Sequence, residues 1–181
     1  SVSITEDAAM TQGATWSIPG VPVTLIAENG NSITITDASN ILGNLTITGG
    51  AVSIRENEDI TDGSAWTTTG TTTLNPGTTG VRGIVLDAVG HVLGDIAIAG
   101  TPLVVTIAEN DSITQASAWS LADIPVNLSV TDDNDITLDQ ISNILGLLDL
   151  TAGGSGNLIL TEADHIGDAA NWTVGGTATL T

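Results

Sequence analysis

Residues 33–50 read ITITDASNILGNLTITGG, and this stretch decides the fold class. Apolar and small polar residues alternate in Ile33-Thr34-Ile35-Thr36 and again in Leu45-Thr46-Ile47. A period of two is typical of strands with one buried side. Asp37-Ala38-Ser39-Asn40 and Gly49-Gly50 follow the two runs, and these residue types favour turns. The stretch therefore predicts short strands separated by tight turns, with no helix.

The same pattern returns along the chain at nearly constant spacing. The Asn40-Ile41-Leu42-Gly43 motif reappears as His91-Val92-Leu93-Gly94 and Asn143-Ile144-Leu145-Gly146, 51 and 52 residues further on. Two single residues keep similar spacings of 50, 53 and 53: a glutamate (Glu6, Glu56, Glu109, Glu162) and, ten residues later, a tryptophan (Trp16, Trp66, Trp119, Trp172). We therefore predict one segment, residues 1–181, made of repeats 1–50, 51–103, 104–156 and an incomplete 157–181.

Long-range repetition favours a parallel β-helix (β-solenoid) over a β-sandwich or barrel, because a sandwich has no need for the same tryptophan every fifty or so residues. Strands are short, so we expect each repeat of about 50–53 residues to form two to three coils. We also expect equivalent positions of successive repeats to lie on one face, where their side chains form ladders. The predicted fold class is all-β.

The ladder residues have structural and functional interpretations. We expect the tryptophans to pack in the core or at a corner rather than to serve as a platform for carbohydrate. Asn40 and Asn143 are expected to lie inside a turn and to bond to the backbone, with His91 as a substitution at the same position. With two histidines and no cysteine, the chain offers little material for a zinc site or a nucleophile–base pair.

The charge is strongly acidic, with 2 Lys plus Arg against 21 Asp plus Glu and a net charge of −19. Nucleic acids and anionic membranes are poor partners for such a surface. No apolar run approaches the roughly 20 residues of a membrane span, so we expect no membrane insertion. The absence of cysteine and the Thr-, Gly- and Asn-rich composition favour an extracellular or cell-surface location.

Acidic clusters raise the question of calcium, which prefers several carboxylate and carbonyl oxygens. We expect no cofactor, with calcium as the one candidate, because the clusters lack the loop pattern of an EF-hand. The candidate ligands are Glu56, Glu58, Asp59, Asp132, Asp133 and Asp135. Four Asn-x-Ser/Thr sequences are candidate glycosylation sites, at Asn44, Asn110, Asn127 and Asn171.

The recurring ITEDA of residues 4–8, ITITDASNILG of residues 33–43 and LTITGG of residues 45–50 resemble repeats of filamentous-haemagglutinin-like giant adhesins. The resemblance extends over nearly the whole chain. It implies a parallel β-helix rod that is secreted and displayed on the cell surface, where it mediates attachment. In such proteins the repeat regions commonly serve as stalks.

Three classes of function are compatible with these patterns. The first is a non-enzymatic rod or filament, a stalk, sheath or surface fibre, which associates end to end or continues in a longer chain because neither terminus resembles a polar cap. The second is an adhesin module that binds a surface, a glycan or ice, suggested by Thr-x-Thr pairs such as Thr46-x-Thr48. The third, a polysaccharide-cleaving enzyme, is disfavoured because no repeat carries a long loop insertion, and we expect no enzymatic activity.

Overall fold

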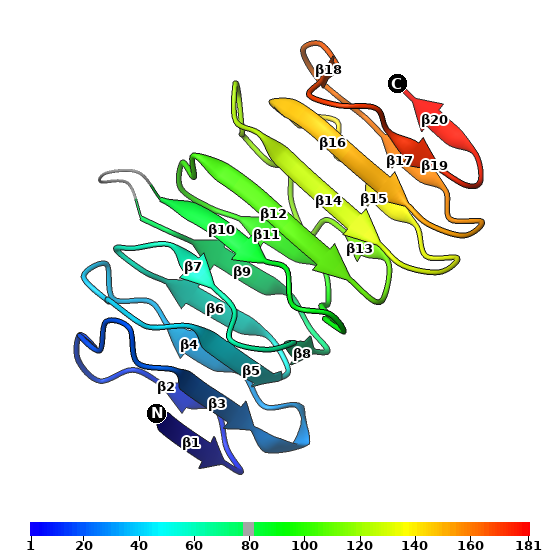
Figure 1. The fold of residues 1–181 in the computed structure, drawn as a ribbon. Coiled ribbons are helices and arrows are strands. Elements are labelled where there is room, and N and C mark those ends of the chain that lie inside the picture. Colours follow the sequence, from blue (N-terminus) through cyan, green and yellow to red (C-terminus); the bar gives the residue numbers. More distant parts are fainter. Residues whose placement is uncertain (78–81) are drawn as a thin grey trace.

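The chain folds into a parallel β-solenoid of about 8 turns, which confirms the predicted fold class. The structure is a computed structural model that describes residues 1–77 and 82–181. Its turns stack from β1 at the N-terminal end to β20 at the C-terminal end, so the termini lie at opposite ends of a short rod (Figure 1). Within the described residues, no helix has the length and apolar character needed to cross a membrane.

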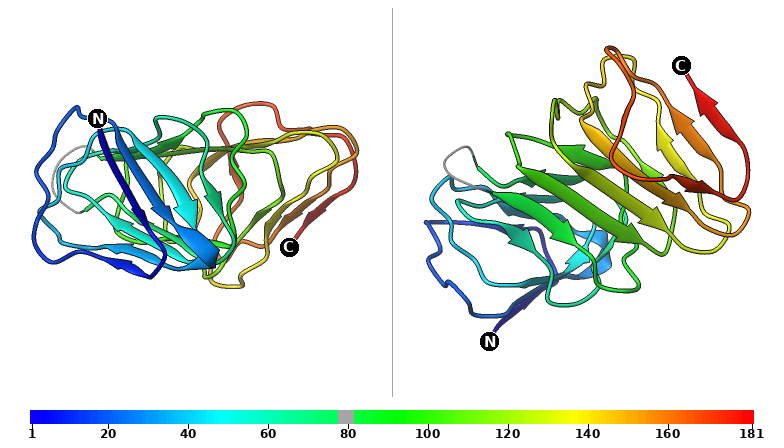
Figure 2. Two further views of the ribbon diagram at one scale, coloured as in Figure 1. Left: turned by 90° about the horizontal axis from the view of Figure 1, so that it is seen from below. Right: turned by 45° about the horizontal axis from the view of Figure 1, so that its top comes forward.

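Two strand-bearing faces enclose the core, and the chain passes from one to the other in every turn (Figure 2). Isolated bridges, Leu45 to Asp62 and Ile96 to Gln115, join the regular ladders within each face. Face 1 consists of β1 (Val2–Glu6), β3 (Val23–Ala27), β5 (Leu45–Gly49), β7 (Ile60–Thr61), β8 (Thr67–Thr68), β10 (Gly83–Leu86), β12 (Val104–Glu109), β14 (Val126–Val130), β16 (Leu147–Ala152), β18 (Gly167–Asp168) and β19 (Thr173–Val174). Face 2 consists of β2 (Met10–Thr11), β4 (Ile33–Ile35), β6 (Val52–Arg55), β9 (Thr72–Asn75), β11 (Ile96–Ile98), β13 (Ile113–Thr114), β15 (Ile136–Leu138), β17 (Leu158–Leu160) and β20 (Ala178–Leu180). A 3-10 turn, η1 (Glu28–Gly30), leads out of β3.

The core follows from the alternation read in the sequence. In β3, Val23, Leu25 and Ala27 are buried while the residues between them are half-exposed, and β4 buries Ile33 and Ile35 in the same way. All ladders are parallel and in register, so that Val23 lies between Val2 and Leu45 in neighbouring turns. Each inward side chain therefore packs on its equivalents above and below, at the inter-strand spacing of about 4.8 Å.

The structural repeat is one turn of about 21 residues, rather than the 50–53 residues of the sequence repeat. Val2 pairs with Val23 and Val23 with Leu45, which are steps of 21 and 22 residues. A sequence repeat therefore spans about two and a half turns. This number agrees with the two to three coils expected for each sequence repeat. The unit that repeats in the fold is nevertheless the single turn and not the 50–53-residue repeat, because the longer period arises from side chains at corners and not from the strands.

Because each sequence repeat includes a half turn, successive repeats begin on opposite faces of the solenoid. The first repeat contains five segments, β1 to β5, so the second repeat begins on the opposite face, at β6. Glu6 ends β1 on face 1, whereas Glu56 follows β6 on face 2. The expectation that equivalent positions of successive repeats share one face was therefore wrong. Successive repeats are instead related by about half a rotation and a rise of roughly 12 Å, two and a half strand spacings.

One glycine of each repeat is required by close approach of the backbone. A Cβ atom at Gly43, Gly94 or Gly146 would overlap a carbonyl oxygen of the preceding turn, that of Val21, Gly70 or Ile124 respectively. These are the glycines that close the motifs beginning at Asn40, His91 and Asn143. The corner is tight at this point, and only a residue without a side chain fits there.

We expect the Gly43→Ala substitution to destabilise the protein by about 3 kcal/mol or more, because the added methyl group must displace backbone rather than a flexible side chain. Gly13→Ala is the matched control, since a Cβ there has nothing within 4 Å. The measurement is the free energy of unfolding in urea for both variants. Equal stability of the two variants would contradict the close packing of the corner.

Candidate functional site

A buried amide joins three successive turns at the corner of the first repeat. Asn40 is fully buried, and its Oδ1 accepts a hydrogen bond from the Trp16 backbone N–H at 2.9 Å. Its Nδ2 donates to Gln12 Oε1 at 3.0 Å, in the preceding turn, and to the Arg55 carbonyl oxygen at 3.1 Å, in the following turn. The Gln12 amide also donates to Asn40 Oδ1. Every polar atom of the Asn40 side chain thus bonds to a neighbouring turn.

The third repeat builds the same arrangement around Asn143. Its Oδ1 accepts from the Trp119 backbone N–H and from Gln115 Nε2, both at 3.0 Å. Its Nδ2 donates to Gln115 Oε1 at 2.9 Å and to the Thr161 carbonyl oxygen at 3.1 Å. The repeat in sequence is therefore a repeat of one buried hydrogen-bond network.

The second repeat replaces the amide pair by an Asp–His pair. His91 is fully buried, and its Nδ1 accepts the Trp66 backbone N–H at 2.9 Å. Accepting that bond requires a lone pair on Nδ1, so the ring proton lies on Nε2, which donates to Asp62 Oδ2 at 2.6 Å. The same Asp62 oxygen accepts from the Ala88 N–H at 2.7 Å.

Both residues of the pair differ between the repeats of this chain: Asp replaces Gln and His replaces Asn. Gln12 and Gln115 precede their asparagines by 28 residues, and Asp62 precedes His91 by 29. Sequence analysis identified His91 as a substitution but missed its partner. The signal was present, because the residue four before each tryptophan is Gln where the motif begins with Asn and Asp where it begins with His.

The repeated glutamates cap backbone groups at the same corners. Leu42 N–H donates to Glu56 Oε2 at 3.2 Å, Leu93 N–H to Glu109 Oε2 at 3.1 Å, and Leu145 N–H to Glu162 Oε1 at 2.9 Å. The other oxygens of Glu56 and Glu109 are buried with no hydrogen-bond partner among the described residues. Glu6 is exposed at the N-terminal turn.

Burial dominates the protonation of these carboxyl groups. Desolvation raises the pKa of Glu56 and of Glu109 to about 8, although the Leu42 and Leu93 N–H groups act in the opposite direction. Desolvation also raises the pKa of Glu162. At neutral pH Glu56 and Glu109 are therefore mostly neutral acids within the corners.

The tryptophans occupy equivalent positions against the preceding turn. Trp66 and Trp119 are fully buried, while Trp16 and Trp172 are partly buried against the core. The indole N–H groups of Trp66, Trp119 and Trp172 donate to the carbonyl oxygens of Leu45 (2.8 Å), Ile96 (3.3 Å) and Leu148 (3.0 Å). Since Trp66 and Trp119 have no exposed ring face, they cannot stack on a sugar.

We call each such set of residues a corner cluster: Gln12, Trp16, Asn40 and Glu56 at the first corner, Asp62, Trp66, His91 and Glu109 at the second, and Gln115, Trp119, Asn143 and Glu162 at the third. In each cluster the glutamate comes from the repeat that follows the other three residues. Its bonds run to backbone groups and side chains of adjacent turns. This arrangement holds turns together and fixes their register, because each buried polar group would otherwise lack a partner.

The candidate calcium ligands form two groups in different turns, one at residues 56–59 after β6 and one at residues 132–135 between β14 and β15. Asp59 accepts the Gly83 N–H at 2.7 Å, Asp133 the Ser155 N–H at 2.8 Å, and Asp135 the Asn157 N–H at 2.6 Å. Glu58 and Asp132 are exposed. Within residues 1–77 and 82–181, no three His, Cys, Asp or Glu side chains are grouped closely enough to hold a metal ion. Calcium binding stays a prediction.

The candidate glycosylation residues differ in exposure. Asn44, Asn110 and Asn171 are exposed, whereas Asn127 is half-buried within β14. Asn44 Oδ1 accepts from Thr61 Oγ1 at 3.1 Å, and Asn110 Oδ1 accepts from Thr131 Oγ1 at 2.8 Å. Asn127 Nδ2 donates to Thr106 Oγ1 at 3.3 Å. Glycosylation at these positions stays a prediction as well.

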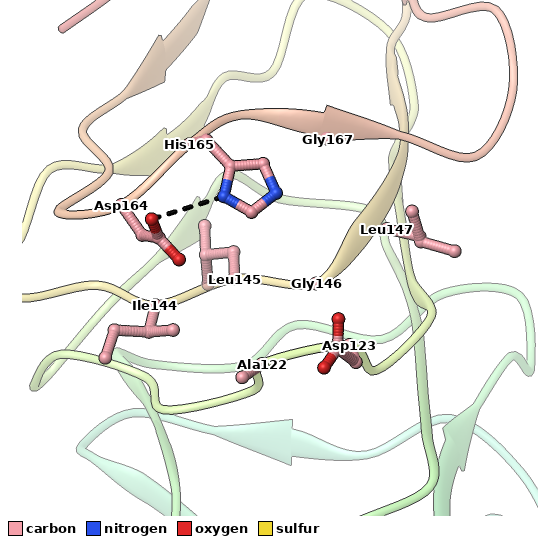
Figure 3. A pocket seen from close by; sticks show the side chains of 9 residues that line it. All are labelled: Ala122, Asp123, Ile144, Leu145, Gly146, Leu147, Asp164, His165 and Gly167. Atoms are coloured by element: carbon pink, nitrogen blue, oxygen red, sulfur yellow. Dashed lines mark ion pairs between the residues drawn. The ribbon is translucent and has the colours of Figure 1, made fainter.

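A pocket of about 260 Å³ opens on the side of the rod near its C-terminal end. Three successive turns line it, through Ala122 and Asp123, through Ile144 to Leu147, and through Asp164, His165 and Gly167. Figure 3 shows the Asp164 and Asp123 carboxyl groups and the His165 ring arranged around it, with His165 Nδ1 lying 3.2 Å from Asp164 Oδ1. Sequence analysis did not single out this site.

Comparison with known proteins gives one match. A family model described as repeats of unknown function (DUF5649) matches residues 30–99. No curated protein and no solved structure gives a significant match. The matched residues run from η1 to β11 and include the Asn40 and His91 motifs.

Exchange of the two kinds of corner pair tests whether the pair acts as a unit. We expect Gln115→Asp and Asn143→His to cost about 2 kcal/mol each, because each leaves a buried polar group without its partner. The double variant Q115D/N143H, which copies the Asp62–His91 pair, should recover at least about 1 kcal/mol of the summed loss. Urea unfolding of the four proteins measures this coupling, and additive costs would show that the paired change has no energetic basis.

The raised pKa values of Glu56 and Glu109 predict a pH dependence. Between pH 4.5 and about 8 the folded state keeps protons that the unfolded chain releases, so the stability that these two groups contribute is full below pH 4.5 and is lost as pH rises toward about 8. The expected slope is about 1.4 kcal/mol per pH unit for each group. Thermal or urea unfolding across this range measures it.

The double variant E56Q/E109Q should flatten that pH profile, since glutamine resembles the protonated acid. Glu28→Gln, at an exposed position, serves as the control and should leave the slope unchanged. Parallel profiles for the wild type and the double variant would show that these two glutamates are ionised in the folded protein.

Proposed function

We propose that this chain is a non-enzymatic structural segment that forms a rigid rod, as part of a stalk, sheath or surface fibre. The observation that carries the proposal is the corner cluster, which occurs three times along the rod and bonds successive turns together. Asn40, for example, contacts Gln12 in the turn before and Arg55 in the turn after. Such contacts stiffen a stack of turns along its axis.

The relation between repeats supports a rod that can be extended. Each repeat rotates by about half a turn and rises roughly 12 Å, so further repeats of the same kind would lengthen the rod in a straight line without altering its cross-section. The match to a family of repeats is in keeping with this picture. The rod would continue in a longer chain or associate end to end, because parallel strand edges can accept another turn.

We further propose an extracellular or cell-surface location and a role like that of the repeat regions of filamentous-haemagglutinin-like adhesins. The support is the sequence resemblance, the absence of cysteine and the net charge of −19. An acidic surface repels other acidic surfaces, which keeps such rods soluble and separate. Nucleic acids are poor partners for the same reason.

A ligand-binding face is the competing proposal, and the Thr-x-Thr pairs provide little support for it. Thr46-x-Thr48 lies on β5 of face 1, while Thr34, Thr73 and Thr179 lie on β4, β9 and β20 of face 2. Because the pairs are divided between two faces, they do not form one continuous array of the kind that ice or a crystalline glycan would require. The structural role is therefore the better supported of the two.

Electron microscopy of the native material tests the proposal. We expect straight, unbranched rods or fibres whose length grows by roughly 12 Å for each sequence repeat in the full-length protein. Salt up to 0.5 M should leave the rods intact, because the contacts between turns are buried. Compact particles, or a length that does not follow the number of repeats, would contradict a rod-forming role.

A further inference from the structure

At one corner of the rod two residues differ from their equivalents at the other corners, and the fold does not require this difference. In the first two repeats the residue after the tight glycine is polar and bonds to a threonine of the next turn. Thr61 Oγ1 donates to Asn44 Oδ1 at 3.1 Å, and Thr114 Oγ1 donates to Asp95 Oδ1 at 2.6 Å. In the third repeat the equivalent residues are Leu147 and Gly167, which cannot form this bond.

Neither the backbone conformation nor a close contact requires glycine at position 167. A Cβ atom at Gly167 would meet its nearest neighbours, the Gly146 carbonyl oxygen and Leu147 Cδ2, at 3.6 Å, which is ordinary van der Waals contact, and its φ is not in the left-handed region. A side chain would therefore fit. By contrast, the neighbouring Gly146 is required, because a Cβ there would overlap backbone.

Packing of the hydrophobic core does not require leucine at position 147 either. Leu147 remains 47 % exposed and Ile144 36 % exposed, and both line the pocket of about 260 Å³ described above. Exchanging a hydrogen-bonded polar pair for an exposed leucine and a glycine leaves apolar surface open to solvent without a gain in packing. Apolar surface of this kind, next to fixed charges, is typical of a binding site.

The charges around the pocket define what would fit. Asp123 and Asp164 contribute carboxyl groups from two different turns, His165 adds a hydrogen-bonding group, and no basic residue other than histidine lines the pocket. The best complement is a group with an apolar stem and a cationic head. A lysine side chain has this form, with a compact ammonium group on a flexible four-carbon stem.

We propose that this pocket binds a lysine side chain presented by another protein. The stem would lie along Leu147 and Ile144, and the ammonium group would be held by the carboxyl groups of Asp123 and Asp164. Residues 1–181 contain no lysine, so a second copy of this segment cannot supply the side chain. The proposal goes beyond the structural role and does not depend on fibre formation.

An NMR titration with the blocked peptide acetyl-Gly-Lys-Gly-amide tests the pocket directly. We expect saturable shifts of the Gly146 and Gly167 amide signals at low ionic strength. The same peptide with norleucine in place of lysine keeps the stem and removes the charge, and should bind at least tenfold more weakly. Absence of shifts at these amides, or equal binding of both peptides, would overturn the proposal.

Two variants provide matched controls. The double variant L147N/G167T restores the Asn44–Thr61 pair of the first repeat, so it should fold with a similar melting temperature and lose binding of the lysine peptide. Asp123→Asn removes one charge at an exposed turn and should weaken binding at least tenfold. Unchanged binding in both variants would show that the peptide lies elsewhere.

The source of the amine is tested with n-butylamine, which carries the same four-carbon stem and ammonium head without a peptide backbone. Binding that is weaker than that of the lysine peptide supports a protein partner, because backbone contacts at the pocket rim then contribute. Binding as tight as that of the peptide would overturn the assignment to a protein side chain and indicate a free small amine instead.

Discussion

Parallel pairing of strands at a fixed rise determines how every turn of the solenoid packs on the next. Each strand bonds to the turn below and the turn above, about 4.8 Å away, so inward side chains such as Val23 must pack on their equivalents Val2 and Leu45. This arrangement leaves corners as the places where backbone groups lack regular partners. The corner clusters supply those partners, and they do so with buried side chains, Asn40, His91 and Asn143, which bond across turns.

The two periods of the chain have different physical origins. The turn of about 21 residues comes from strand pairing, and the sequence repeat of about 50 comes from the corner clusters, which recur every two and a half turns. Because that number includes a half, successive repeats point to opposite sides of the rod. A solenoid built in this way displays any feature of a repeat alternately on its two sides, and neither side is distinguished unless one copy departs from the pattern.

Copies that depart from the pattern are informative because the other copies show what the fold alone requires. The Asp62–His91 pair replaces a Gln–Asn pair and keeps the hydrogen bonds to the tryptophan backbone, so it preserves the corner by other chemistry. Leu147 and Gly167 replace a bonded polar pair and line a pocket. The Asp62–His91 pair keeps the structural role of its corner. Leu147 and Gly167, in contrast, remove a hydrogen bond between turns without improving the packing.

The all-β class, the repetition and the identity of the recurring residues could be predicted from the sequence, because alternation and spacing are local properties of a chain. The regular recurrence of Trp16, Asn40 and Glu56 could be read in this way, but the contacts between them could not. The length of a turn, the alternation of faces, the contact between Asp62 and His91 and the pocket beside Gly167 became known from the folded structure. These depend on which residues lie one turn apart, and turns of 19 to 24 residues vary with the length of each corner. Whether two residues 28 apart in sequence become neighbours depends on the number of residues in the turn between them.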